Sequence, residues 1–162
     1  MLFLLDADTI ITGDRLAYPL QRFRVFWEWL CSKGAAGYVK IPLEQYEEIV
    51  GGRGEIVDWV RDRRGALLLN EQAKKGLVQR VVHSGYGELN EDEIEQVGRD
   101  PFLISYALAD ADNRTVVTFE RSAPSKRRAN RKVPDVCATV GVRSCTLYEM
   151  LVSLDFTADW RP

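Results

Sequence analysis

The feature that most constrains the fold of this chain is a short apolar run at its start, which stops at a carboxylate. Residues Leu2 to Leu5 are all leucine or phenylalanine, and Asp6 follows them directly. A run of this length, bounded by polar residues, is typical of a strand buried on both faces of a parallel sheet. It is too short for a membrane span, which needs about 18 apolar residues. We therefore expect a buried strand over residues 2–6, with Asp6 at its carboxyl end.

Beyond this run, short strand-like segments alternate with helical patterns. Apolar residues recur at intervals of three and four after Pro19, which predicts a helix. The further strands are expected at residues 37–41, 115–119 and 140–143. The helices are expected at residues 20–30, 42–50, 56–60, twice within 70–97, at 100–108, from 134 onwards and at 147–154. Alternating strands and helices predict an α/β sandwich around a mostly parallel sheet, in which ligands gather at the carboxyl ends of the strands.

Length and composition indicate one domain and an ordinary globular protein. The chain has 162 residues, 46% of them hydrophobic, and no linker divides it, so we expect a single domain over residues 1–162. The apolar start has no basic leader and no small-residue cleavage site, which favours a cytoplasmic protein without a membrane partner. The three cysteines have no metal-ligand spacing and are expected to be reduced. The single histidine excludes a multi-histidine metal site.

Four acidic residues occupy positions where carboxylates could converge. Asp6 and Glu120 each follow an expected strand, Glu48 lies late on the helix after Pro42, and Asp100 begins another helix. Two converging carboxylates about 4 Å apart repel each other by around 4 kcal/mol at an effective dielectric constant of about 20. Such a site must either hold protons or bind a divalent cation. Ligands that are all oxygen suit Mg²⁺ or Mn²⁺, which activate water for phosphodiester displacement.

Each of these acids also has a simpler interpretation. Asp6 could be an ordinary carboxylate at the end of a strand, and Asp100 before Pro101 fits the cap of a helix. Capping and metal binding are compatible, because a cap uses one carboxylate oxygen. Glu47 and Glu48 lie about 100° apart on a helix, so we expect one of them to face solvent, and we favour Glu48 for the site.

The sequence resembles the PIN-domain proteins, in a less-characterised, VapC-like branch. The residues that carry the resemblance to PIN domains are Leu4-Leu5-Asp6-Ala7-Asp8-Thr9, Tyr46-Glu47-Glu48-Ile49 with Gly52, Asp100-Pro101-Phe102-Leu103-Ile104 with Ala107, and Val116-Val117-Thr118-Phe119-Glu120. The branch is marked by Phe26-Trp27-Glu28-Trp29-Leu30 after Tyr18-Pro19, and by Val133-Pro134-Asp135-Val136-Cys137. The order of these acid-bearing segments is that of PIN domains, and the marks together cover nearly the whole chain.

The resemblance implies a three-layer α/β/α sandwich and a Mg²⁺- or Mn²⁺-dependent endoribonuclease, often the toxin of a toxin–antitoxin pair. It implies RNA as substrate, an antitoxin as protein partner, and a homodimer. Asp6, Glu48, Asp100 and Glu120 match the acidic, metal-binding positions of the family. The last of these is usually Asp, so Glu120 could act on the metal through water. Thr118 matches a recurring hydroxyl position. The candidate extra acids are Asp8 and Asp135.

A basic segment follows the last acid directly. Its cations are Arg121, Lys126, Arg127, Arg128, Arg131 and Lys132. They could contact RNA phosphates, which gives affinity that depends on salt and not on base sequence. The same loop could instead be a solvated surface, or be covered by an acidic segment of an antitoxin.

Two rival functions belong to other classes. Asp6-Ala7-Asp8-Thr9-Ile10 also fits the opening motif of haloacid-dehalogenase-like phosphatases, in which Asp6 would be the nucleophile and Asp8 the acid/base. That interpretation gives no role to Glu48 or Asp100 and lacks the later strand with paired acids. Alternatively, the chain could be a PIN-like scaffold without catalysis that acts as a binding module. Divalent-metal binding separates an intact site from such a scaffold.

Two further expectations concern the aromatic residues and the end of the chain. Most aromatic residues near position 26 fit a buried helical stripe, but Trp29 falls off that stripe and could serve an interface. The stretch 155–162 is expected to be poorly ordered.

Overall fold

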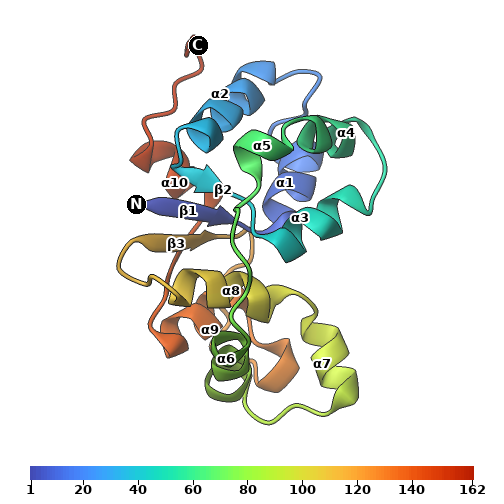
Figure 1. The fold of residues 1–162 in the computed structure, drawn as a ribbon, viewed down its shortest axis with the longest axis vertical. Helices are drawn as coiled ribbons and strands as arrows, with labels where there is room; N and C mark the ends of the chain where they lie inside the picture. Colours follow the sequence, from blue (N-terminus) through green and yellow to red (C-terminus); the bar gives the residue numbers. More distant parts are fainter.

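A four-stranded sheet forms the centre of the computed structural model, which describes residues 1–162 (Figure 1). The strands are β1 (Leu2–Leu5), β2 (Val39–Lys40), β3 (Arg114–Val117) and β4 (Arg143–Cys145). All neighbouring strands run parallel, in the order β2-β1-β3-β4. Their carboxyl ends therefore lie along one edge of the sheet. This is the edge at which the sequence predicts the site.

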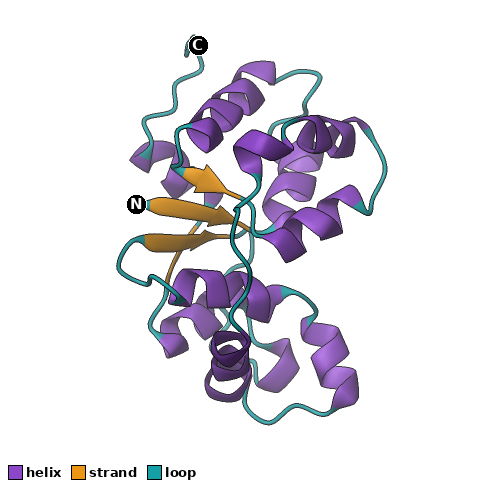
Figure 2. Cartoon of the chain, in the orientation of Figure 1, coloured by secondary structure: helices purple, strands orange, loops and turns teal.

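Helices cover both faces of this sheet and complete a three-layer α/β/α sandwich (Figure 2). The helices are α1 (Ala7–Thr12), α2 (Arg24–Ala35), α3 (Leu43–Val50), α4 (Glu55–Asp62), α5 (Arg64–Leu67), α6 (Lys75–Arg80), α7 (Glu91–Val97), α8 (Asp100–Leu108), α9 (Val133–Val140) and α10 (Leu147–Ser153). Two π-helical turns, η1 (Gly13–Ala17) and η2 (Val81–Tyr86), and a 3₁₀ turn, η3 (Arg128–Asn130), join them. The α/β class and the mostly parallel sheet predicted from the sequence are confirmed.

The first strand separates two apolar clusters. Phe3 and Leu5 pack in a cluster formed with α1 to α5 and α10, whereas Leu4 packs in a cluster formed with η2, α7, α8 and α9. Successive side chains of a strand point to opposite faces of its sheet, so an unbroken apolar run supplies both clusters. This burial on two faces explains why the strand lacks polar alternation, and it confirms the expected buried strand at the start of the chain.

The last strand lies later than the sequence pattern predicts. We expected a strand over residues 140–143, but α9 continues to Val140 and β4 begins at Arg143. Gly141 ends the helix in the left-handed region, at φ 81°, where a residue with a side chain is disfavoured. The apolar Val142 then packs in the core beside α9 and does not belong to the strand.

Phe26 and Trp27 are buried, as expected for most of the aromatic residues, whereas Phe23 precedes the start of α2 and is 42% exposed. The expectation for Trp29 was wrong, because its side chain is fully buried and does not serve an exposed interface. Part of the stretch 155–162 packs against the core, although poor order was expected there. The ring centroid of Phe156 lies 4.9 Å from that of Trp29.

No helix of the structure combines the length and the apolar character that crossing a bilayer requires. The three cysteines are free thiols, of which Cys137 is buried, as the sequence predicts.

Candidate active site

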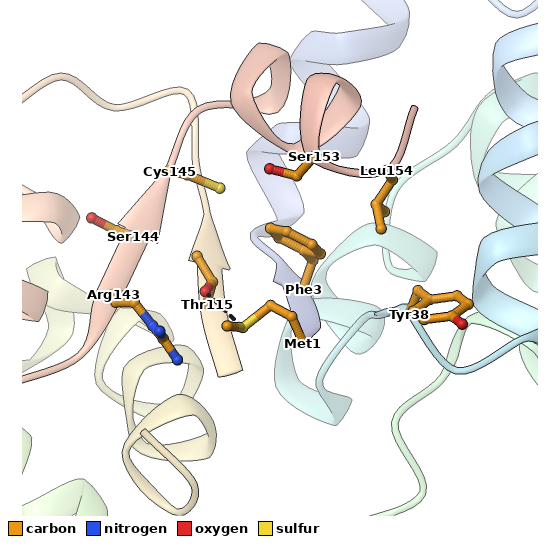
Figure 3. A pocket seen from close by; sticks show the side chains of 9 residues that line it. All are labelled: Met1, Phe3, Tyr38, Thr115, Arg143, Ser144, Cys145, Ser153 and Leu154. Atoms are coloured by element: carbon orange, nitrogen blue, oxygen red, sulfur yellow. Dashed lines mark hydrogen bonds between the residues drawn. The ribbon is translucent and has the colours of Figure 1, made fainter. Parts of the chain in front are cut away.

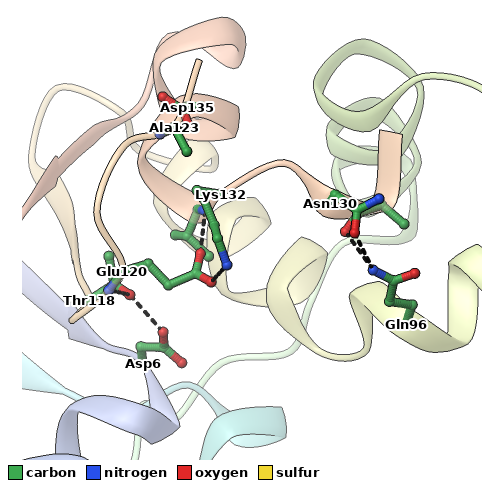
Figure 4. A network of polar contacts seen from close by, with 10 residues as sticks. Asp6, Gln96, Thr118, Glu120, Ala123, Asn130, Lys132 and Asp135 are labelled. Atoms are coloured by element: carbon green, nitrogen blue, oxygen red, sulfur yellow. Dashed lines mark hydrogen bonds and ion pairs between the residues drawn. The ribbon is translucent and has the colours of Figure 1, made fainter. Parts of the chain in front are cut away.

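The pairing of β1 with β3 brings the first candidate acid beside the hydroxyl of Thr118. The register aligns Leu5 with Val117, and the backbone amide of Asp6 donates to the carbonyl of Val117 at 3.0 Å. The hydroxyl of Thr118 donates to Oδ2 of Asp6 at 2.9 Å, and the amide of Glu120 donates to Oγ1 of Thr118 at 3.1 Å (Figure 4). Thr118 therefore links the two strand-end acids.

Burial dominates the chemistry of Asp6. This side chain is 8% exposed, and burial raises its pKa to about 6. The hydrogen bonds from Thr118 and from the backbone of Asp8 oppose the rise in pKa, whereas the negative charges of Asp8 and Glu48 add to it. Asp6 is therefore a carboxyl group that takes up a proton close to neutral pH unless a positive charge compensates it.

Asp100 shows the strongest sign that the acids converge. Burial, followed by the charges of Asp6, Glu120 and Glu48 in that order, raises its pKa to about 8. The cation of Lys132 acts in the opposite direction. The structure thus brings the four predicted acids within electrostatic reach of one another, from β1, α3, α8 and the end of β3.

The expected role of Asp100 as a helix cap was wrong. Asp100 is the first residue of α8, Arg99 occupies the cap position, and no side chain caps the helix. Pro101 at the second position has no amide hydrogen that needs a cap. The carboxylate of Asp100 is therefore not engaged in capping and remains available to the site.

A network around Arg99 fixes α3 against the start of α8. The side chain of Gln45 donates to the carbonyl of Arg99 at 3.0 Å, and the guanidinium of Arg99 donates to the carbonyl of Glu44 and, at 3.2 Å, to the carboxylate of Glu47. Glu47 and Glu48 are both exposed. Because Glu47 pairs with Arg99 while the charge of Glu48 acts on Asp6 and Asp100, the structure favours Glu48 as the member of the acidic group.

Glu120 is held from the start of α9. One carboxylate oxygen accepts from Nζ of Lys132 at 2.7 Å, and the other accepts from the backbone amide of Val133 at 2.7 Å. Lys132 is thus an internal counter-ion of the acidic group. A cation bound between these acids would compete with this ammonium group for Glu120.

The two candidate extra acids lie at the margin. Asp135 accepts from the hydroxyl of Ser122 and, at 2.8 Å, from the amide of Ala123, and these bonds lower its pKa. Asp135 therefore anchors the loop that follows Glu120. Asp8 is exposed on α1 and accepts from the hydroxyl of Thr12. No acidic residue directly follows β4, which ends at Cys145 and is followed by Thr146.

The basic segment divides into two groups. Arg128 pairs with Glu93 at 2.5 Å, Arg131 donates to the carbonyls of Gly85 and Asp135, and Lys132 pairs with Glu120. The three that have no acidic partner and are exposed are Arg121, Lys126 and Arg127. Only this second group is free to meet a polyanion directly.

A cavity of about 400 Å³ with a mostly polar lining adjoins one of the acids, Glu120. Thr118, Arg121, Thr146 and Glu149 also line it. A larger, more apolar cavity of about 560 Å³ lies elsewhere, and Met1 and Tyr38 are among the residues that line it (Figure 3). None of the four acids lines that second cavity, so the cavity that belongs to the site is the smaller one.

Sequence reasoning gave no role to Tyr86, which ends the π-helical turn η2. Its side chain is 4% exposed, and its hydroxyl is buried without a hydrogen-bond partner. Burial, together with the charges of Asp100 and Glu120, raises the pKa of this phenol above its usual range. The only sequence signal is a bulky residue between two glycines, Gly85 and Gly87.

The donor set fits a hard divalent cation in its chemistry. Its ligands would be carboxylate oxygens, which Mg²⁺ and Mn²⁺ prefer, and the mutual repulsion recorded in the raised pKa of Asp100 is the kind that such a cation relieves. No three His, Cys, Asp or Glu side chains already form a closed ligand group. A metal would be held by Asp6, Asp100 and Glu48, with Glu120 released from Lys132 or acting through water.

A comparison with known protein families assigns the chain to one of them. Residues 3–158 match the model of a family described as a domain of unknown function, DUF4411. The chain belongs to this family. The match spans all four strands and all four acids of the site, so the site is part of the DUF4411 domain. Neither the curated proteins nor the solved structures compared with the chain gave a match.

Proposed function

We propose that this protein is a Mg²⁺- or Mn²⁺-dependent endoribonuclease of the PIN type. The proposal rests on the raised pKa of Asp100. Burial and the charges of Asp6, Glu120 and Glu48 produce this rise together. Carboxylates that repel one another at the carboxyl edge of a parallel sheet are costly for folding. A site with this property is expected where a cation or an acid–base step uses it.

The four acids and Thr118 would have different roles in the reaction. Asp6, Asp100 and Glu48 would hold the cation, which would supply a Lewis acid and lower the pKa of a water molecule. Thr118 orients Asp6 through the 2.9 Å hydrogen bond, and Glu120 would complete the negative site. The RNA phosphodiester would lie in the cavity beside Glu120.

The cations without acidic partners supply the attraction for RNA. A polyanion is repelled by the four acids unless positive charge lies close by. Arg121 lines the cavity beside Glu120, and Lys126 and Arg127 extend the positive surface along the same loop. Their exposure suits contact with phosphates.

The proposal extends to partners and location. The same exposed cations would accept an acidic segment of an antitoxin, which would block RNA and silence the nuclease. We propose that the chain acts as the toxin of such a pair, as a homodimer in the cytoplasm. Co-purification with the product of a neighbouring gene, lost on replacing Arg121, Lys126 and Arg127 by glutamine, tests this part.

The decisive experiment measures cleavage of a panel of structured and single-stranded RNAs. It compares Mn²⁺, Mg²⁺ and EDTA, and it includes Asp100→Asn and the matched surface variant Asp112→Asn. Asp112 is exposed just after α8, and no hydrogen bond involves its carboxylate. We expect metal-dependent cleavage in the parent and in Asp112→Asn, and none in Asp100→Asn.

Cleavage that persists in Asp100→Asn would reject the assignment, since a contaminating nuclease or another site would then be responsible. If no RNA is cut but Mn²⁺ still binds to the parent and not to Asp100→Asn, the metal site stands without the nuclease. If neither occurs, the chain is a scaffold without catalysis. Cleavage of a phosphomonoester that is lost in Asp8→Asn would favour the phosphatase instead.

A further inference from the structure

The buried hydroxyl of Tyr86 has no partner, although its turn η2 packs against α8 and α9. A buried polar group without a hydrogen bond is destabilising, because it has lost its bonds to water without a replacement. Nearly all such groups in native proteins are paired, and each exception calls for an explanation such as a catalytic role or an absent ligand. Tyr86 is 4% exposed and its Oη is unpaired, so the hydroxyl is costly as it stands.

The backbone next to Tyr86 is closely packed against α9. Tyr86 ends η2, a π-helical turn, a type of irregularity that is frequent at functional sites. Gly85 allows η2 to approach α9 closely, because a Cβ added there would lie 2.6 Å from Cγ1 of Val136. The guanidinium of Arg131 donates to the carbonyl of Gly85 and also to that of Asp135 in α9. These contacts hold the backbone next to Tyr86 against α9.

The surroundings of the hydroxyl are those of the acidic site. The turn η2 packs against both α8, which begins at Asp100, and α9, which begins beside Lys132. Asp100 is the charge that acts most strongly on the phenol, and Glu120 acts on it as well. The two oxygens of Glu120 accept from Lys132 and Val133, and Tyr86 donates to neither of them.

A phenol next to carboxylates keeps its proton and can only act as a donor toward a negative group. A cation bound by the neighbouring carboxylates would leave this unpaired donor available to an anionic oxygen. We propose that Tyr86 donates a hydrogen bond to a non-bridging oxygen of the phosphate held at the acidic site. It is then a catalytic residue that stabilises charge on the phosphoryl group. This inference rests on the proposed function for the identity of the phosphate as part of RNA.

The test uses Tyr86→Phe, which keeps the ring and removes only the oxygen. Binding of inorganic phosphate in the presence of Mg²⁺, followed by calorimetry, is expected to weaken about 10-fold, because a hydrogen bond to a charged group is lost. RNA cleavage is expected to fall about 100-fold in kcat, as for the loss of one donor to a developing oxyanion. Binding of Mn²⁺ without phosphate should not change.

The matched control is Tyr106→Phe. Tyr106 is equally buried, on α8, but its hydroxyl donates to the carbonyl of Glu71 at 3.4 Å, so it has a partner within the protein. We expect this control to retain phosphate binding and cleavage, and to lose some stability. Tyr86→Phe should show the opposite pattern, with unchanged or slightly higher stability.

The outcomes separate this proposal from the proposed function. Weaker phosphate binding in Tyr86→Phe, in a protein that cuts no RNA, would support the phosphate contact and reject the nuclease. Metal-dependent cleavage and phosphate binding that are both unchanged in Tyr86→Phe would reject the phosphate contact and leave the nuclease standing. A parent protein that binds no phosphate, or a Tyr86→Phe protein whose only defect is lower stability, would also overturn the proposal.

Discussion

The hydroxyl of Thr118 donates a 2.9 Å hydrogen bond to the carboxylate of Asp6, 112 positions earlier in the chain. Both residues follow directly after paired strands, and both are buried. The bond favours the charged form of Asp6 and so opposes the rise in its pKa that burial causes. Thr118 therefore keeps Asp6 available as an anion in a place where burial alone would neutralise it.

Replacing Thr118 by valine tests this relationship. The change removes the donor to Asp6 and the acceptor of the Glu120 amide. Asp6 then keeps only the bond from the backbone of Asp8, and the Glu120 amide loses its partner. We expect the free energy of unfolding to fall by about 1–3 kcal/mol and the affinity for Mn²⁺ to fall about 10-fold or more. Urea unfolding and calorimetric titration with Mn²⁺ measure the two effects.

Two controls separate the loss of the hydroxyl from general damage to the core. Thr118→Ser keeps the hydroxyl and should retain most of the Mn²⁺ affinity. Thr9→Val also removes a buried hydroxyl, which donates to the carbonyl of Val117 at 3.0 Å, but leaves the bond to Asp6 intact. If Thr9→Val weakened Mn²⁺ binding as much as Thr118→Val, the effect would not belong to the bond between Thr118 and Asp6.

The raised pKa of Asp100 predicts how stability depends on pH in the absence of metal. The pKa lies at about 8 in the folded protein and near 3.8 when unperturbed. Between these values the folded state holds a proton that the unfolded chain releases, so the free energy of unfolding falls as the pH rises. Asparagine stays neutral at every pH. In EDTA at pH 8 we expect Asp100→Asn to be more stable than the parent by about 1–3 kcal/mol.

The gain should vanish near pH 4, where Asp100 is protonated in the folded protein as well. Thermal unfolding at several pH values, with Asp112→Asn as the exposed control, measures the difference. Mn²⁺ should reverse the order at pH 8 by stabilising the parent alone. An Asp100→Asn protein less stable than the parent at pH 8 in EDTA would show that the charges at this site are not in conflict.

Much of this site follows from local patterns in the sequence. The apolar run before Asp6 and the β-branched run before Thr118 each predict a buried strand, and parallel strands place their following residues at one edge of the sheet. These strand predictions need only periodicity and chain direction. The resemblance of the acid-bearing segments to those of PIN domains is what singles out Glu48 and Asp100.

The contacts that tune the site could not be predicted in this way. The pair of Lys132 with Glu120, the network of Arg99 with α3, and the buried hydroxyl of Tyr86 all join segments that pack only in the folded chain. Sequence spacing does not reveal which side chain of a basic loop turns inward. It also favoured Asp100 as a helix cap, because Asp before Pro is a common start to a helix, whereas Arg99 occupies that position.

The salt dependence of RNA binding tests the division of the basic segment. Arg121, Lys126 and Arg127 are exposed and have no acidic partner. Each phosphate contact to single-stranded RNA contributes about 0.7 to the slope of log affinity against log salt. Replacing all three by glutamine should therefore reduce the slope by about 2 if each contacts one phosphate. Filter binding in Ca²⁺, over a range of salt concentrations, measures it.

The control for this slope is Arg128→Gln, whose guanidinium pairs with Glu93 at 2.5 Å. Because that charge is already paired within the protein, its loss should change the slope by less than the loss of any one of the three exposed cations. An equal or larger change would show that the pair with Glu93 opens to bind RNA.

Gly85 gives the sharpest test of how the fold supports Tyr86. A Cβ at this position would lie 2.6 Å from Cγ1 of Val136, so alanine must push η2 away from α9. Overpacking of this kind costs about 1–3 kcal/mol, and we expect Gly85→Ala to lower the free energy of unfolding by that amount in urea. Gly76→Ala is the matched control, because Gly76 lies within α6 with open space around it. Alanine there should raise stability by about 0.5–1 kcal/mol. Equal stability of the two variants would mean that η2 can shift without cost, and the placement of Tyr86 would then not be enforced by its packing on α9.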